Sequence, residues 1–168
     1  MKVTRIFVDC EFIEDGKTID LISLGAVTED GRYFYAVSSD FDESKANQWV
    51  RDNVLTRLEP SETWVPRAVI AAKFQAWVDQ FLPVEFWGYY ADYDWVAICQ
   101  LYGPMIALPK GWPMYCADIE QWAIALSAPV DILPQPAGPE EHHALKDALW
   151  NKTSWEALAE FARTLVPR

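Results

Sequence analysis

An early segment of the chain reads Arg5-Ile6-Phe7-Val8-Asp9-Cys10-Glu11-Phe12, an apolar, β-favouring run that leads into two acidic residues. Alternate side chains of a strand point to opposite faces, so Asp9 and Glu11 are predicted on one face and Cys10 on the other. Two carboxylates side by side in a hydrophobic element repel each other and are poorly solvated unless a cation or a shared proton neutralises them. Mg²⁺ and Mn²⁺ prefer such oxygen ligands. The alternative is a solvated strand end, where acidic residues are usually found.

A second acidic position follows Val84-Glu85-Phe86-Trp87-Gly88-Tyr89-Tyr90, which reads as a buried strand. The apolar positions of residues 92–101 fit a helix, so its aspartates lie at a strand-to-helix junction. Asp92 suits a helix N-cap, because its side chain can accept the free amides of the first turn. Asp94 lies further inward and is expected to face the site, where the helix dipole helps to keep it ionised.

The third acidic position is Asp147, which follows a segment rich in proline and glycine around residues 134–139. Such a segment cannot continue a helix and predicts a loop. In one regular helix, at about 100° per residue, His142 and Asp147 would lie well over a quarter-turn apart. We therefore place His142 in the loop and Asp147 on the helix. A neutral histidine accepts protons near physiological pH, although the adjacent pair His142 and His143 could also be simply exposed.

Together the four acids and His142 predict a metal-dependent nuclease site. Two cations about 4 Å apart can clamp a scissile phosphate, activating the attacking water and stabilising the departing 3′ oxygen. His142 would take the proton of that water. The residue types therefore match what cutting a phosphodiester requires.

The order Asp-x-Glu, aromatic-Asp before a helix, and His followed five positions later by Asp resembles the DEDDh group of 3′-to-5′ exonucleases. That group has the RNase H-like fold and includes RNase T, oligoribonuclease and polymerase proofreading subunits. Residues 9–25 are similar to the start of RNase AS, a bacterial exoribonuclease group that trims adenylate tails and has phage relatives. Residues 93–105 and 36–38 extend the similarity, which covers most of the chain.

The resemblance implies roles for individual residues. The metal ligands for two Mg²⁺ ions, for which Mn²⁺ could substitute, are Asp9, Glu11, Asp94 and Asp147. The general base is His142. Phe12 and the backbone at Ile13 are expected to lie against the terminal nucleotide, together with Glu11 and His142.

The sequence also departs from the wider DEDDh group. Phe12-Ile13-Glu14 stands where many members have Thr-Thr-Gly, and the asparagine often found shortly before the second-motif aspartate is absent. Tyr89, Tyr90 and Asp92 occupy that region instead. These differences point away from the proofreading and RNase T branches and leave base preference open.

The implied activity is a 3′-to-5′ exoribonuclease that releases nucleoside 5′-monophosphates from single-stranded RNA 3′ ends, with a preference for adenylates and as a homodimer. Two rival activities remain within the enzyme class, a 3′-to-5′ DNA exonuclease and a general oligoribonuclease. A third alternative is a catalytically silent nucleic-acid-binding module that keeps the fold.

Composition sets the remaining expectations. With 168 residues and 51% hydrophobic content, the chain suits one exonuclease domain spanning residues 1–168. No apolar run approaches the roughly 18 residues of a membrane span, and there is no room for a signal peptide before the first strand, so we expect a cytoplasmic protein without a membrane partner. Cys10, Cys99 and Cys116 are expected to be free thiols.

The net charge of -11 argues against extended duplex binding, since long polyanions are normally held by a basic face. A short single-stranded 3′ end could instead stack on aromatic side chains. The chain has nine Trp, seven Tyr and eight Phe to choose from.

The predicted fold is α/β, with an RNase H-like mixed sheet in which three antiparallel strands are followed by alternating helices and strands. Strands are expected near residues 3–12, 19–28, 32–38 and 84–90, with hairpin turns at 14–16 and 30–31. Helices are expected near 43–52, 66–81, from 92, 117–126 and 143–151. A last helix is expected to begin at the capping-box pattern Thr153-Ser154-Trp155-Glu156.

Overall fold

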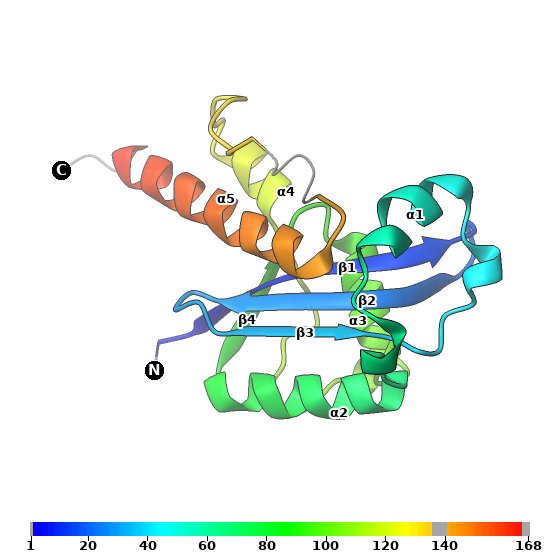
Figure 1. Ribbon diagram of the computed structural model, residues 1–168. Coiled ribbons are helices and arrows are strands. Elements are labelled where there is room, and N and C mark those ends of the chain that lie inside the picture. Colours follow the sequence, from blue (N-terminus) through cyan, green and yellow to red (C-terminus); the bar gives the residue numbers. More distant parts are fainter. Residues whose placement is uncertain (1, 136–140, 166–168) are drawn as a thin grey trace.

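A mixed five-stranded sheet forms the centre of the computed structural model, which describes residues 2–135 and 141–165 (Figure 1). In the described part of the chain the strand order is β3-β2-β1-β4-β5. β1 pairs antiparallel with β2, and β2 with β3, whereas β4 runs parallel to both β1 and β5. The strands are β1 (Thr4–Glu14), β2 (Ile19–Thr28), β3 (Tyr33–Val37), β4 (Val84–Gly88) and β5 (Ala117–Asp118).

Helices cover both faces of this sheet, with α2 along one face and α5 across the other (Figure 1). The α-helices are α1 (Gln48–Asn53), α2 (Arg67–Val78), α3 (Asp92–Gln100), α4 (Ile119–Ala125) and α5 (Ala144–Leu165). Short 3₁₀ helices are η1 (Glu43–Lys45), η2 (Leu55–Arg57), η3 (Ser61–Thr63), η4 (Asp79–Phe81) and η5 (Met105–Ala107). None of the helices that the structure describes is both long and apolar enough to cross a membrane.

The alternation of β1 divides its residues between the two faces. Ile6, Val8 and Cys10 are buried in the main core, which includes side chains of α2 and α3. Phe7 lies on the other face, where it packs with Ala148 of α5. The same alternation places Asp9 and Glu11 on the α5 face, as the sequence predicts.

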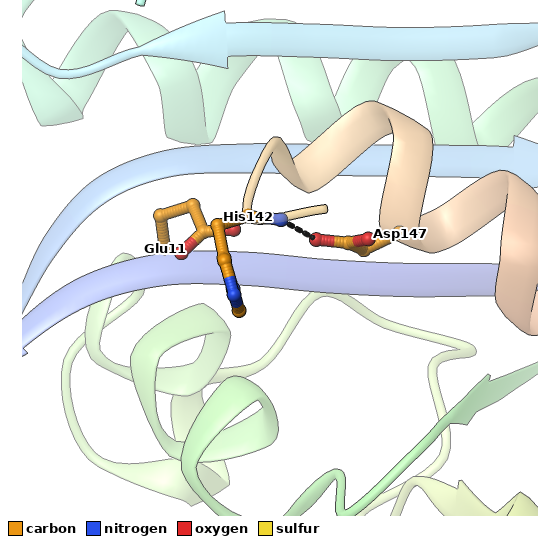
Figure 2. A group of neighbouring side chains, drawn as sticks. All are labelled: Glu11, His142 and Asp147. Atoms are coloured by element: carbon orange, nitrogen blue, oxygen red, sulfur yellow. Dashed lines mark hydrogen bonds between the residues drawn. The ribbon is translucent and has the colours of Figure 1, made fainter. Parts of the chain in front are cut away.

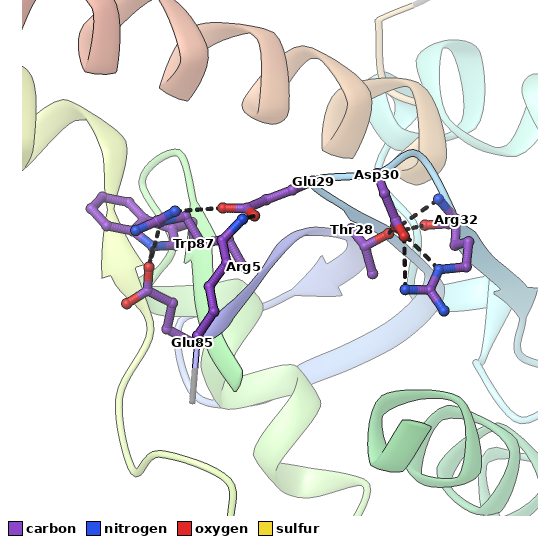
Figure 3. Close-up of polar contacts among 8 residues, drawn as sticks. Arg5, Thr28, Glu29, Asp30, Arg32, Glu85 and Trp87 are labelled. Carbon is purple, nitrogen blue, oxygen red and sulfur yellow. Dashed lines mark hydrogen bonds and ion pairs between the residues drawn. The ribbon is translucent and has the colours of Figure 1, made fainter. Parts of the chain in front are cut away.

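Polar contacts join several elements at the end of the sheet that is remote from Asp9 and Glu11 (Figure 3). Arg5 forms ion pairs with Glu29 and Glu85, the latter at 2.6 Å between Nε and Oε1, and its guanidinium lies over the ring of Trp155. The predicted hairpin turn at residues 30–31 is present, since the Thr28 amide donates to the Arg32 carbonyl. These contacts connect β1, β4, the β2–β3 turn and α5 at the end remote from Asp9 and Glu11.

Four expectations about helices need correction. Residues 43–52 divide into η1 and α1, because the Asn47 side chain accepts the Val50 amide and starts a new helix. Similarly, η4 follows α2 within the predicted helix 66–81. The predicted helix 117–126 begins only at Ile119, since Asp118 ends β5 and caps α4. Asp92 is not an N-cap, because that position is Ala91.

The C-terminal region forms one helix where two were expected. α5 runs unbroken through the capping-box pattern, so the prediction of a new helix at Thr153 is wrong. Thr153 donates its hydroxyl to the Leu149 carbonyl one turn earlier, and Ser154 is fully buried. A helix interior satisfies the Thr153 hydroxyl in this way, whereas the buried Ser154 hydroxyl has no hydrogen-bond partner among the described residues. The predicted loop at residues 136–139 lies outside the described residues.

Candidate active site

The five predicted site residues come from three elements and one loop, and the sheet brings them to one place. β4 pairs with β1 only as far as Phe7, so the continuation of β1 leaves its edge open to α3. The Cys10 amide donates to Oδ1 of Asp94 over 2.8 Å, at the position where a further parallel strand would pair. Asp94 is thereby fixed beside Asp9 and Glu11.

The first turn of α5 lies directly on β2 next to Asp9. Gly25, which pairs with Asp9 across the β1–β2 ladder, makes this approach possible. A Cβ atom at Gly25 would come within 2.2 Å of the Ala144 carbonyl oxygen, so only glycine fits. One turn beyond Asp147, the buried Asn151 donates its side-chain amide to the Val8 carbonyl over 2.9 Å. Asp147 thus lies between two contacts of α5 with the sheet, one with β2 at Ala144 and one with β1 at Asn151.

His142 lies in the loop immediately before α5, and Asp147 lies on the helix, as predicted. Oδ2 of Asp147 accepts the amides of His142 and His143 at 2.8 and 3.2 Å, so the carboxylate also caps the helix start. Figure 2 shows the His142 ring beside the carboxylate of Glu11. Glu11, His142 and Asp147 each offer a ligand atom within 4.8 Å of the others, close enough to hold one metal ion.

The carboxylates of this site raise one another's pKa. Burial, followed by the charges of Asp147 and Asp94, raises the pKa of Glu11 to about 8. Burial raises the pKa of Asp94 to about 7, although the hydrogen bond from Cys10 opposes the shift. The pKa values of Asp9 and Asp147 are also raised, chiefly by burial. Such a group repels itself when ionised, and a divalent cation removes that repulsion.

A pocket of about 190 Å³ opens beside these carboxylates. Aromatic rings form one wall, where Tyr89 and Trp150 meet edge to face with 5.0 Å between ring centroids. The lining residues are Asp9, Tyr89, Glu141, His142, Asp147, Trp150 and Asn151. The pocket therefore joins a set of oxygen ligands to an aromatic surface of the kind on which a base can stack.

Phe12 and Ile13, two of the four residues expected to contact substrate, differ in exposure. Phe12 is half-buried and stacks on Tyr93 of α3 with 5.9 Å between centroids. Ile13 is buried among side chains that include Val50 and Val54, so its side chain is enclosed in the core and only its backbone is available to substrate. A β-bulge between Glu11 and Phe12 alters the strand at this point.

Several residues around the site escaped prediction from sequence. Asn151 is one, and its signal was a polar residue inside an otherwise amphipathic helix. Arg57 is another: its charge partly offsets the rise in the pKa of Glu11, and it donates to the Glu141 carbonyl over 2.7 Å. No local pattern places an arginine of η2 beside a loop that lies 84 positions further along the chain.

Comparison with known proteins bears on this geometry directly. A family model described as the 3′-5′ exoribonuclease Rv2179c-like domain matches residues 4–159. The chain belongs to this family. Two members from Mycobacterium tuberculosis, 3′-5′ exoribonuclease Rv2179c and 3′-5′ exoribonuclease MT2234.1, are each 43% identical to it over 148 residues, which is 86% of this chain and 86% of theirs.

Solved exonuclease structures share the fold of this Rv2179c-like chain. The zinc-bound form of the Escherichia coli exonuclease I–ssDNA complex aligns with a TM-score of 0.68 and 12% identity, covering 98% of this chain and 42% of that one. Pop2p of S. pombe, in its Mg²⁺- and Mn²⁺-bound form, aligns with a TM-score of 0.57 and 13% identity over 95% of this chain and 83% of its own. These likenesses confirm the RNase H-like α/β fold.

Proposed function

We propose that this chain is a metal-dependent 3′-to-5′ exoribonuclease that removes nucleoside 5′-monophosphates from the 3′ ends of single-stranded RNA. The observation that carries the proposal is the convergence of four carboxylates and His142 at one place on the sheet, where Asp9, His142 and Asp147 line a pocket. Membership of the Rv2179c-like family supports a 3′-5′ exonuclease, and its named relatives are exoribonucleases. We further propose that residues 1–168 form one such domain.

The proposed metal ligands are Asp9, Glu11, Asp94 and Asp147. Their donor atoms fit two Mg²⁺ ions, or Mn²⁺ in their place, because both ions prefer carboxylate oxygens and leave positions for water and phosphate. Their raised pKa values are what an uncompensated acidic group produces in the absence of such ions. When bound, the ions would lower the pKa of the attacking water and stabilise charge on the departing oxygen.

His142 is the proposed general base. Its ring lies beside Glu11 and Asp147, where it can accept the proton of a water aimed at the phosphate. The Asp147 carboxylate, by accepting the His142 amide, keeps the base next to the metal ligands. This orientation speaks against a catalytically silent binding module, in which His142 would be expected to turn away.

The terminal nucleotide is proposed to lie against Phe12, the backbone at Ile13, Glu11 and His142. Stacking of a base on an aromatic ring is worth about 1 to 3 kcal/mol, and Phe12 is already supported from behind by Tyr93. A net charge of -11 suits a short single-stranded end held by metal and stacking rather than a long duplex held by a basic face.

The finer properties rest on the resemblance to RNase AS over residues 9–25. They are a preference for adenylates and a homodimeric assembly. Selection of RNA over DNA would require a contact between the protein and the 2′ hydroxyl. The names of the two mycobacterial relatives, both called exoribonucleases, support RNA as the substrate proposed for this chain.

A substrate panel tests the proposal. Purified protein is incubated with oligo(A), oligo(U), mixed RNA and the matching DNA, with Mg²⁺, Mn²⁺ or EDTA, and the products are separated by chromatography. We expect nucleoside 5′-monophosphates from RNA with either metal, fastest from oligo(A), and none with EDTA. Equal rates on all RNAs would remove the adenylate preference, faster cleavage of DNA would make this a DNA exonuclease, and no cleavage of any substrate would contradict the enzyme.

A further inference from the structure

The backbone of His142 adopts a conformation that residues other than glycine rarely adopt. Its φ of 64° lies in the left-handed region, which is uncommon and strained for residues other than glycine. Such a conformation persists only when surrounding contacts impose it. The contacts of residues 141–143 therefore indicate what holds the proposed base in position.

Each of residues 141–143 contacts a different residue between positions 49 and 59. Nη1 of Arg57 donates to the Glu141 carbonyl over 2.7 Å. The ring of Trp49 meets the ring of His142 edge to face, with 4.7 Å between centroids and 74° between planes.

The third contact involves the neighbouring histidine. Nε2 of His143 lies 3.2 Å from Oε1 of Glu59, and its ring stacks on Tyr35 with 4.6 Å between centroids. Three consecutive loop residues thus have partners that lie within eleven positions of one another, between residues 49 and 59. We call Trp49, Arg57 and Glu59 the positioning cluster.

The positioning cluster shares its support with the metal ligands. Val50 and Val54 of the α1 region are buried against Ile13 of β1 and Ile22 of β2. β1 also carries Asp9 and Glu11. Arg57 additionally donates to the Asn53 carbonyl within its own segment, which restricts its guanidinium. The strand that fixes the carboxylates therefore also fixes the residues that hold His142.

We infer that Trp49, Arg57 and Glu59 are positioning residues that act through His142, holding its ring beside Glu11 and Asp147. The inference rests on the proposed function, in which His142 is the general base. A rival role exists for Arg57, since its charge reaches Glu11 and it could contact the substrate phosphate directly. The test must separate these two roles.

The first measurement needs no enzymatic activity. The chain has only two histidines, so a ¹H–¹³C spectrum of the metal-free protein contains two imidazole ring signals for each type of carbon, and His142→Ala assigns them. We expect Arg57→Ala and Trp49→Leu to shift or broaden the His142 signals, and Glu59→Gln to shift those of His143. Arg51→Ala is the matched control, because among the described residues the Arg51 guanidinium donates to carbonyls of residues 43–46 and pairs with the Glu43 carboxylate, away from residues 141–143. It should leave both sets of signals in place.

The second measurement is a double-mutant cycle with oligo(A) as substrate. Arg57→Ala should lower kcat by roughly 10- to 100-fold with little change in KM, because misplacing a catalytic group by about 1 Å can cost that much. In a His142→Ala background the same change should have no further effect. Arg57→Lys, which retains a donor and the charge, should recover part of the lost rate.

Two results would overturn the inference. One is His142 signals that do not move in Arg57→Ala and Trp49→Leu. The other is an Arg57→Ala loss of equal size with and without His142, which would assign Arg57 to the substrate instead. Both results leave the proposed exonuclease standing, whereas an inactive wild-type protein with the expected spectral shifts would remove the exonuclease and retain the positioning contacts.

Discussion

At the scale of single residues, ionisation of the buried carboxylates destabilises the folded protein when no metal ion is bound. Glu11 has a pKa of about 8 in the folded protein, well above its usual 4.5, because burial and the neighbouring acids disfavour its charge. Between these values the folded state binds more protons than the unfolded state. Stability of the metal-free protein should therefore fall as pH rises through this window.

Glu11→Gln tests that sign. With EDTA present, we expect the wild-type melting temperature to decline from pH 5 to pH 8, and the decline to be smaller in Glu11→Gln because the amide does not ionise. Saturating Mg²⁺ should raise the wild-type melting temperature most at pH 8. Glu62→Gln, at an exposed position, is the control. A wild-type protein that becomes more stable over this range without metal would contradict the assignment of Glu11.

Substitutions of His142 and of Asp147 should differ in their effects: the first should lower the rate alone, and the second should lower both the rate and the affinity for Mg²⁺. His142→Ala is expected to lower kcat by about 10²- to 10⁴-fold, the usual contribution of a general base, while Mg²⁺ binding measured by calorimetry persists. Asp147→Asn should abolish turnover and weaken Mg²⁺ binding, because it removes a proposed ligand. If His142→Ala kept wild-type rates from pH 6 to 8, another group would have to be the base.

At the scale of elements, the site depends on how closely α5 approaches the sheet. Gly25→Ala should lower the free energy of unfolding by about 3 kcal/mol or more. The new methyl group would overlap the backbone at Ala144, and relieving that overlap would require α5 or β2 to move. Urea denaturation measures the loss. Gly31→Asn is the control, because that glycine is in open space and asparagine tolerates its positive φ. A Gly25→Ala protein as stable as wild type would mean that α5 does not lie on β2 here.

The sequence predicted the strands and the elements that carry the proposed site residues better than the helix boundaries. Alternation in β1 correctly put Asp9 and Glu11 on one face, because one side of that strand is buried by α2 and α3. Helix boundaries are harder to predict, because a side chain that could cap a helix can also lie inside one when tertiary packing continues the helix. Thr153 and Ser154 match a capping box, yet packing of α5 on the sheet keeps them inside one helix.

Residues that act across long sequence separations could not be predicted. Arg57 reaches Glu141, and Asn151 reaches Val8 across 143 positions. Neither contact leaves a periodic or motif-like trace in the chain, because each depends on where the sheet places two remote segments. The roles proposed for Asp9, Glu11, Asp94, His142 and Asp147 still await the experiments above.

At the scale of the whole molecule, a net charge of -11 should make the proposed RNA binding depend on divalent ions. Two polyanions repel each other, and the proposed ions would be the main positive charge at the point of contact. The His142→Ala protein, which should retain its ligands, is expected to bind labelled oligo(A) with Mg²⁺ and to release it with EDTA, as measured by fluorescence anisotropy. Binding that is equally tight in EDTA would point to a separate basic surface instead.

The most direct measurement follows a 5′-labelled single-stranded RNA on a sequencing gel during incubation with wild-type protein and Mg²⁺, with EDTA and Asp147→Asn as parallel reactions. We expect a ladder that shortens one nucleotide at a time from the 3′ end with Mg²⁺, and intact RNA in both controls. Immediate release of a labelled mononucleotide, internal cleavage, or a ladder that persists in EDTA or in Asp147→Asn would contradict the metal-dependent 3′-to-5′ exonuclease.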